Sequence, residues 1–317
     1  MKRIGTDWQA LLQEIEEAVR LLDNGDCTQP LKPYLRYGDP RNRIIAMPAY
    51  VGGAVHTAGL KWIASFPDNL RQGLPRAHSV TILNDADSGA PFALLHGALL
   101  SAVRTAAVSG LMLRRYSDIL PAPADLRVGI IGWGPVGRLH LEMCAALFPD
   151  AVSQVIAHDI RPVDLELVPP SLQAATSIAD SWPALYRQCN VVITCTASRD
   201  RYVSLPPQPG SLLLHVSLRD YEANALRSIP HIVVDDWREV CRENTDIEQL
   251  HLLHGLQEED TISLRDVVCR DALSAVLTDP GKESVMFAPM GMAVFDIAVA
   301  SWFVRESRRL DIGIALE

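Results

Sequence analysis

A glycine-rich turn between an apolar run and a helical pattern constrains the fold of this chain more than any other feature. The run Val128–Ile131 is typical of a buried parallel strand, and it leads directly into Gly132-x-Gly134-x-x-Gly137. A helical pattern of apolar residues follows. In such strand–turn–helix units the first glycine permits the tight turn, the second lets a pyrophosphate approach the backbone, and the third allows close helix–strand packing. The stretch therefore predicts an α/β protein with a Rossmann-type dinucleotide-binding domain.

An acidic residue after the next predicted strand indicates which dinucleotide is preferred. The strand Gln154–His158 ends in Asp159. An acid at this position hydrogen-bonds the adenosine ribose, and its charge repels a 2′-phosphate. We therefore expect NAD as the cofactor, although Arg161, two residues further on, argues for NADP. A chance glycine turn in an unrelated α/β protein is the alternative.

Length, charge and cysteine spacing narrow the class of protein. With 317 residues the chain is long enough for about two domains with cores of their own. Its net charge of −9 argues against nucleic acid and anionic membranes as partners. The longest apolar stretch, Phe92–Leu113, contains His96 and Arg104, which disfavours a membrane span. The six cysteines lack metal-binding spacing, and residues 1–20 lack a signal-peptide core. These features predict a cytoplasmic protein without a metal site.

The order of the predicted elements indicates two domains, one of them discontinuous. Short β-prone runs between residues 30 and 64, separated by proline and glycine, predict mainly antiparallel strands. A proline-containing linker is expected at residues 117–125. Near the end of the chain, residues 283–300 read as a strand, a turn and an apolar helix that returns to the first domain. The predicted domains are residues 1–118 with 289–317, an α+β domain, and residues 119–288, the Rossmann domain.

Two basic residues of the first domain lie within apolar stretches. Lys61 precedes Trp62-Ile63-Ala64, and is either a solvated charge on an edge strand or a buried functional ammonium. Composition alone favours the solvated interpretation. Arg104 interrupts the apolar face of a helix predicted over residues 96–116. Because a charge on such a face is rarely buried without a partner, an anionic ligand is a candidate partner.

Polar residues follow two predicted strands of the second domain, residues 191–195 and 212–216. In an open parallel sheet these carboxyl ends line the ligand crevice. Position alone therefore makes crevice candidates of Thr196, Ser217, Arg219 and Asp220. A plain helix N-cap is the alternative for Asp220.

Several sequence blocks, in the same order, resemble the ornithine cyclodeaminase/mu-crystallin family from about residue 30 to the end of the chain. The blocks are Arg43–Tyr50, Gly59–Trp62, Asp87–Pro91, Ala102–Ala107, Gly132–Gly137 and Met290–Asp296. The resemblance implies a Rossmann NAD-binding domain, a discontinuous substrate-binding and dimerisation domain, and a homodimer.

The resemblance also implies roles for residues that match family positions. Lys61 matches a lysine beside the substrate amine and the nicotinamide, and Asp220 matches the catalytic aspartate. Arg104 matches a carboxylate-binding arginine, and Arg36 a second one. Thr105 matches a residue near the cofactor phosphates. The glycine turn, the strand ends and the resemblance together predict cofactor contacts at Thr105, Gly132, Gly134, Pro135, Val136, Gly137, Asp159, Ile160, Arg161, Thr196, Ser217, Leu218 and Arg219.

Two departures from the cyclodeaminase pattern bear on the substrate. Ile45 stands where cyclodeaminases have a glutamate, and an apolar side chain cannot act as an acid or base. Arg76 stands where they have a threonine of the substrate loop, and adds a cation to Arg36, Lys61 and Arg104. Because arginine can grip a carboxylate bidentately, such a pocket suits a small amino-acid conjugate with several carboxylates.

Four stretches most resemble the family members that release 2,3-diaminopropionate in siderophore and antibiotic assembly. They are Pro30–Arg36, Lys61–Asn69, Ser217–Asp220 and Arg242–Ile247. The implied reaction is NAD-dependent oxidative hydrolysis of N-(2-amino-2-carboxyethyl)-L-glutamate, with Asp220 as the base and Lys61 orienting a carboxylate. Two alternatives remain open: an ornithine cyclodeaminase that forms proline and ammonia, and a non-catalytic NAD(P)H-dependent binding protein like mu-crystallin.

Overall fold

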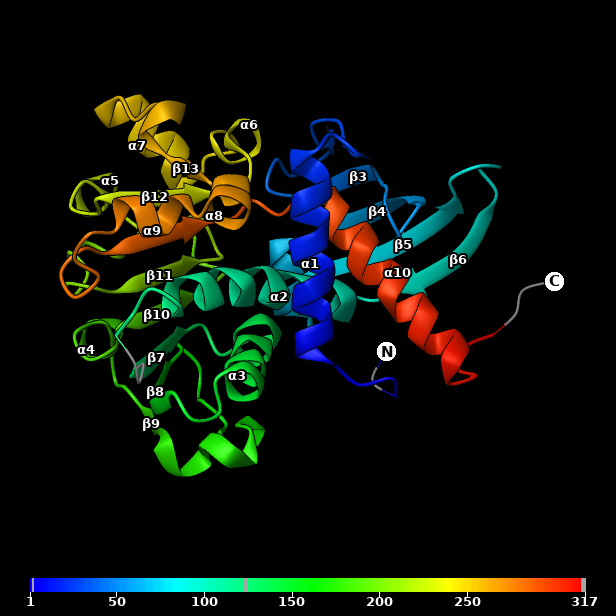
Figure 1. Cartoon of the computed structure of the whole chain (residues 1–317). Helices are drawn as coiled ribbons and strands as arrows, with labels where there is room; N and C mark the ends of the chain where they lie inside the picture. Colours follow the sequence, from blue (N-terminus) through cyan, green and yellow to red (C-terminus); the bar gives the residue numbers. More distant parts are fainter. Residues whose placement is uncertain (2, 122–124, 315–317) are drawn as a thin grey trace. The chain divides into compact units, whose positions relative to one another are not determined.

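The computed structural model describes residues 1, 3–121 and 125–314, which divide into two compact units (Figure 1). Unit 1 comprises Met1–Val108 and Gly291–Glu317, and unit 2 comprises Ser109–Met290. The sequence placed these boundaries after residues 118 and 288. The first boundary falls earlier, within helix α2 (Ala98–Ser117), whose two halves belong to different units. Residues 122–124 of the expected linker lie outside the described residues.

In the described part of unit 1, six strands form an antiparallel sheet. The strands are β1 (Cys27–Thr28), β2 (Tyr34–Leu35), β3 (Arg43–Val51), β4 (Thr57–Ser65), β5 (Ala77–Asp85) and β6 (Pro91–His96). Their order is β1-β3-β4-β5-β6, with β2 paired to β3. The prediction of mainly antiparallel strands between residues 30 and 64 is confirmed. Strand β4 is an interior strand, hydrogen-bonded on both sides.

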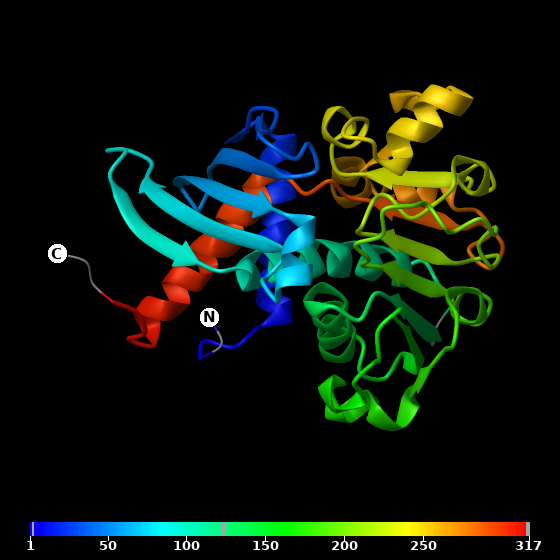
Figure 2. The same cartoon turned by 180° about the vertical axis from the view of Figure 1, so that it is seen from behind.

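Two helices cover one face of this sheet, α1 (Trp8–Asp23) and α10 (Ala293–Arg309). Alternate side chains of the strands, such as Met47, Ala49 and Leu83, are buried on that face. Helix α10 is apolar over its first three turns apart from Asp296 and Ser301, and Ala293–Val304 is continuously buried. Figure 2 shows α1 and α10 behind the strands, with the other face of the sheet towards the viewer.

Unit 2 is built on a parallel sheet with the order β13-β12-β14-β11-β10-β7-β8-β9. Its strands are β7 (Leu126–Ile131), β8 (Val152–His158), β9 (Thr176–Ile178), β10 (Val191–Thr194), β11 (Leu212–His215), β12 (His231–Val234), β13 (Ile262–Ser263) and β14 (Val285–Ala288). Strands β10, β11 and β14 are buried at every residue, as expected where both faces of a sheet are covered. The strand order reverses between β7 and β10, which is the switch point of a doubly wound sheet. The predicted α/β fold with a Rossmann-type sheet is confirmed.

The longest helix that lies wholly in unit 2 is α3 (Pro135–Leu147), which follows the glycine turn. The shorter helices are α4 (Trp182–Tyr186), α5 (Ala223–Leu226), α6 (Trp237–Val240), α7 (Asp246–His254), α8 (Leu264–Arg270) and α9 (Ala272–Val276). The 3₁₀ helices among the described residues are η1 (Pro67–Gln72), η2 (Leu165–Leu167), η3 (Pro170–Ala175) and η4 (Glu258–Asp260). Among the described residues, no helix combines the length and apolarity needed to cross a membrane.

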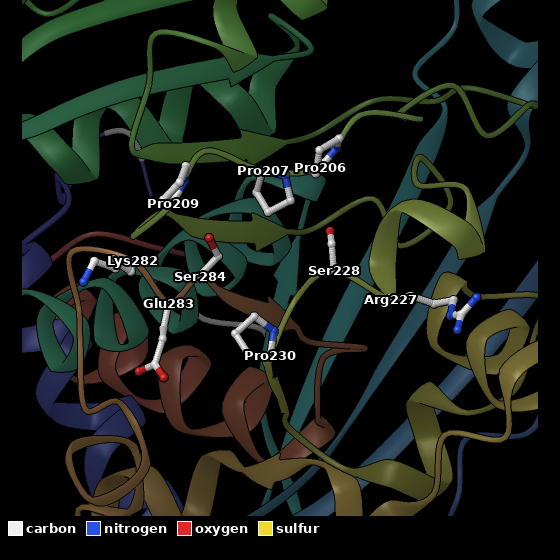
Figure 3. Close-up of a pocket in the computed structure, with 9 residues that line it drawn as sticks. All are labelled: Pro206, Pro207, Pro209, Arg227, Ser228, Pro230, Lys282, Glu283 and Ser284. Atoms are coloured by element: carbon white, nitrogen blue, oxygen red, sulfur yellow. The ribbon is translucent and has the colours of Figure 1, made fainter.

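A surface pocket of unit 2 lies at the amino ends of β11, β12 and β14. Figure 3 shows its lining residues, Pro206, Pro207, Pro209, Arg227, Ser228, Pro230, Lys282, Glu283 and Ser284. Ligands of open parallel sheets bind at the opposite, carboxyl ends of the strands. We therefore do not assign this pocket to the dinucleotide.

Candidate functional site

The glycine turn has the geometry that a bound pyrophosphate requires. Gly132 has φ +102°, and a Cβ there would lie 2.6 Å from the carbonyl oxygen of Cys195. A Cβ on Gly137 would lie 2.2 Å from the carbonyl oxygen of Gly132. By contrast, no described atom lies within 4 Å of a Cβ built on Gly134. The turn thus leaves open backbone beside the N-terminus of α3, where N–H groups and the helix dipole favour phosphate.

Asp159 follows β8 and supports the same turn. Its Oδ2 accepts a hydrogen bond from the backbone N–H of Trp133 at 2.8 Å. Its Oδ1 accepts one from the backbone N–H of Arg161 at 2.9 Å, and the Arg161 Nε lies 3.4 Å from the same oxygen. The neighbouring Ile160 is fully exposed. The Arg161 guanidinium, the feature that favours NADP, therefore lies beside the Asp159 carboxylate, the feature that favours NAD.

Three predicted crevice residues meet at the ends of β10 and β11. The buried carboxylate of Asp220 accepts a hydrogen bond from Thr196 Oγ1 at 2.6 Å and another from Ser217 Oγ. Helix α5 begins at Ala223 and its N-cap residue is Glu222. The interpretation of Asp220 as a plain helix cap is therefore wrong. Both of its oxygens are oriented by hydroxyl groups instead.

Two other predicted cofactor contacts, Leu218 and Arg219, lie in the same loop. Leu218 is buried and has φ +63°, a left-handed backbone conformation that is costly without glycine. The Arg219 side chain donates to the carbonyl oxygen of Glu243 at 2.8 Å. The loop is therefore fixed to residues further along the chain.

In unit 1, Lys61 lies on the face of β4 that α10 covers, and its side chain is 3 % exposed. Its Nζ donates to Asp296 Oδ1 at 3.0 Å and to Ser101 Oγ at 2.7 Å. Arg104 Nε donates to the same Asp296 oxygen at 2.8 Å. The solvated interpretation of Lys61 is wrong, because β4 is an interior strand with a helix on this face.

A third cation belongs to this group. Lys32 is buried and donates to the carbonyl oxygen of Gly291 at 2.7 Å. We call Lys32, Lys61, Arg104 and Asp296 the cation cluster. Lys61 and Arg104 share the carboxylate of Asp296, whose Oδ2 has no hydrogen-bond partner among the described residues.

Burial and neighbouring charges shift the pKa values in the cation cluster. Burial, helped by Arg104 and Lys32, lowers the pKa of Lys61 to about 8, against the opposing pull of Asp296. Burial alone would raise the pKa of Asp296. Arg104 and Lys61 outweigh it, and hold the pKa of that carboxyl below its usual range. At neutral pH the basic groups of Lys61 and Arg104 therefore face a single ionised carboxylate.

The other predicted residues of unit 1 have different surroundings. Arg36 is exposed, donates to the carbonyl oxygen of Pro40 at 3.3 Å and lies over the ring of Tyr34. Arg76 is half-buried directly before β5, and Thr105 Oγ1 donates to the carbonyl oxygen of Ser101. The structure thus places Lys32 in the cation cluster, whereas Arg36 is exposed.

Sequence reasoning missed Lys32 and Asp296, although a signal existed for each. Lys32 lies in the block Pro30–Arg36 that already resembled the family. Asp296 is an acid inside the apolar run Ala293–Val304, where a buried charge needs a partner. Among the described residues, no group of three or more His, Cys, Asp or Glu side chains could hold a metal ion.

Comparison with known proteins identifies relatives along nearly the whole chain. Residues 3–310 match the sequence profile of the ornithine cyclodeaminase/mu-crystallin family. The chain is 31% identical to N-((2S)-2-amino-2-carboxyethyl)-L-glutamate dehydrogenase of Staphylococcus aureus, over 98% of this chain and 94% of the relative.

Solved structures share the fold. The Delta(1)-pyrroline-2-carboxylate reductase of Thermococcus litoralis, solved with NADH and L-proline, superposes with a TM-score of 0.86 at 21% identity, covering 98% of this chain and 96% of that chain. An archaeal alanine dehydrogenase dimer with bound NAD gives a TM-score of 0.80 at 23% identity, covering 98% and 95%.

Proposed function

This chain belongs to the ornithine cyclodeaminase/mu-crystallin family, and we propose that it oxidises N-(2-amino-2-carboxyethyl)-L-glutamate with NAD and water. The products are 2,3-diaminopropionate, 2-oxoglutarate and NADH, and the first serves siderophore or antibiotic assembly. The chain is an NAD-dependent enzyme that acts on an amino-acid substrate.

The cation cluster carries the proposal for the substrate. Lys61 and Arg104 are both buried against the single carboxylate of Asp296, so these three groups together have positive charge left for an anionic ligand. The proposed substrate has three carboxylates. Ornithine has one carboxylate and two amines, and its second ammonium would add to the positive excess. The charge balance therefore favours the conjugate over ornithine.

Asp220 is the proposed proton acceptor. NAD held at the glycine turn Gly132–Gly137 would supply the hydride acceptor for the α-carbon of the glutamate part. The amine proton passes to the Asp220 carboxylate, whose orientation is set by Thr196 and Ser217. Water then adds to the resulting imine, and the C–N bond of the carbinolamine breaks to give the ketone and the free amine. Lys61 holds a substrate carboxylate beside the reacting carbon.

The test is a product assay with purified protein, NAD and the conjugate. We expect NADH and 2-oxoglutarate to accumulate in equal amounts, and ornithine to give no proline, because Ile45 cannot handle the proton that ammonia release needs. Proline formed at a matching rate would contradict the proposal and favour a cyclodeaminase. Tight NAD(P)H binding without turnover of either compound would favour a binding protein.

We also propose that two copies pair through the open face of the unit 1 sheet. Cross-strand neighbours Leu60, Trp62, Val80, Ile82 and Leu94 share this face, and Trp62 and Leu94 are 39% and 58% exposed. Apolar patches of this kind mark interaction sites. The archaeal alanine dehydrogenase of the same fold is a dimer.

Sedimentation of single variants tests this pairing. Trp62→Asp should give a monomer, because a carboxylate would be buried in the interface. Leu252→Asp is the matched control, since Leu252 is 65% exposed on α7 of unit 2. A dimeric Trp62→Asp protein would contradict the proposed surface.

A further inference from the structure

A second buried carboxylate, Asp246, holds the loop that carries Asp220. Asp246 is the first residue of α7 and is completely buried. Its Oδ2 accepts hydrogen bonds from the backbone N–H groups of Asp220 and Tyr221, both at 2.8 Å. Its own backbone N–H donates to the carbonyl oxygen of Leu218, also at 2.8 Å. Three hydrogen bonds therefore join Asp246 to the backbone on either side of Asp220.

The same carboxylate is anchored to the sheet. His215, the last residue of β11, places its Nε2 2.7 Å from Asp246 Oδ2, and its Nδ1 lies 2.8 Å from Thr194 Oγ1 at the end of β10. Arg201 Nε donates to Asp246 Oδ1 at 2.6 Å. Both oxygens are thus engaged, with the sheet on one side and the loop on the other.

The backbone on both sides of this contact has a conformation that side chains disfavour. Leu218, Glu243 and Asn244 have φ values of +63°, +64° and +56°. Such conformations persist only where the surroundings over-determine them, and they cluster at functional sites. Here Arg219 donates to the Glu243 carbonyl oxygen, and Arg201 donates to that of Asn244 at 2.8 Å. The carbonyl groups of the strained residues Glu243 and Asn244 are therefore both held by arginine side chains.

We infer that Asp246 is a positioning residue for the reaction: it fixes the backbone at residues 218–221, so that Thr196 and Ser217 hold the Asp220 carboxylate in one orientation. Asp246 is itself buried and acts through Asp220. The inference rests on the proposed role of Asp220 as the proton acceptor.

The Asp246→Asn change tests this role. Four donors point at the carboxylate, from Arg201, His215, Asp220 and Tyr221. A carboxamide accepts through only one of its two terminal atoms, so some of these bonds are lost and the loop loosens. Because small misplacements of catalytic groups are costly, we expect kcat to fall by about 10²-fold, with the KM for NAD within about twofold of wild type.

A double-mutant cycle separates positioning from general damage. If Asp246 acts through Asp220, Asp246→Asn should change kcat by no more than about twofold in an Asp220→Asn protein. Glu239→Gln is the matched control: Glu239 is a buried carboxylate paired with Arg242 at 2.6 Å, as Asp246 is with Arg201. Its kcat should stay at the wild-type level.

The outcomes are distinct. A full 10²-fold loss on top of Asp220→Asn, or the same loss in Glu239→Gln, would overturn the inference. Wild-type activity of Asp246→Asn would overturn the positioning role of Asp246 but leave the proposed role of Asp220 intact. Wild-type activity of Asp220→Asn would overturn the proposed role of Asp220. Should Asp246→Asn fail to fold, Arg201→Lys serves instead, since Arg201 is 24% exposed and lysine keeps the charge but not the Nε bond. The kcat of Arg201→Lys should fall about tenfold when Asp220 is present, and Arg201→Lys should leave the kcat of an Asp220→Asn protein unchanged.

Discussion

Each unit buries a carboxylate among basic side chains, but the two units balance the charge differently. Asp296 of unit 1 receives hydrogen bonds from Lys61 and Arg104 on a single oxygen, and a third cation lies nearby. Asp246 of unit 2 has Arg201 on one oxygen, and His215 with two backbone N–H groups on the other. The first arrangement keeps positive charge for a ligand. In the second arrangement, protein groups engage both oxygens of Asp246, and the carboxylate holds a loop.

If unit 2 carries the chemistry, its variants should affect the rate. We expect Asp220→Asn to lower kcat by about 10²–10⁴-fold, because the carboxamide cannot accept the proton. NAD binding should persist, since the two side chains have nearly the same shape. Initial rates of NADH formation at saturating NAD measure the effect. Full activity of Asp220→Asn would show that Asp220 accepts structural hydrogen bonds but does not take the substrate proton.

If the cation cluster is held together by its one carboxylate, removing that charge should destabilise the protein. Asp296→Asn leaves Lys61 and Arg104 buried without a charged partner, which costs about 3–5 kcal/mol. Urea unfolding of Asp296→Asn and Asp246→Asn sharpens the comparison. The loss in Asp246→Asn should be smaller, because Arg201 is partly exposed and can be solvated. Equal losses would contradict the distinction between the two carboxylates.

If the cation cluster binds the substrate, its variants should affect affinity. Arg104→Met should weaken binding of the conjugate by about 2–5 kcal/mol, since a desolvated carboxylate loses its partner. Arg36→Met is the matched change at an exposed arginine of the same unit, and should stay near wild type. KM values for the conjugate report both. A comparable rise of KM in Arg36→Met would indicate that Arg36 also binds the substrate.

The depressed pKa of Lys61 predicts a pH dependence. With a pKa of about 8, Lys61 is an ammonium below that pH and loses its charge above it, so the KM for the conjugate should rise between about pH 7.5 and 9.5. Lys61→Arg keeps the charge and should remove this rise. Because the folded pKa lies below the unfolded value of 10.5, native stability should increase from pH 8 towards 10.5. A KM that does not change over this range would contradict the role of the ammonium.

The two units also differ in how many of their candidate site residues could be predicted from the sequence. The glycine turn, Asp159 and the strand ends at Thr196 and Ser217 were found from local patterns, because turn chemistry and apolar runs are local properties. Lys61 was read as solvated, because nothing in its own segment shows that β3 and β5 flank it.

Residues whose role depends on distant contacts escaped the sequence. Asp246 lay in a block that resembled the family, yet only the fold brings it against the backbone of Asp220, 26 residues earlier. Lys32 and Arg36 lie in one short segment, and only the paired strands decide which of them is buried. Composition can show that a cation is present, but not which side chain meets Asp296.

A binding titration tests most directly whether the cation cluster is built for several carboxylates. The conjugate, glutamate and ornithine, with three, two and one carboxylates, are titrated against the protein saturated with NADH, which does not support oxidation. We expect affinity to fall in that order by about tenfold or more per carboxylate, about 1.4 kcal/mol each, and Arg104→Met to flatten the series. Ornithine binding as tightly as the conjugate would contradict an excess of positive charge at the substrate site.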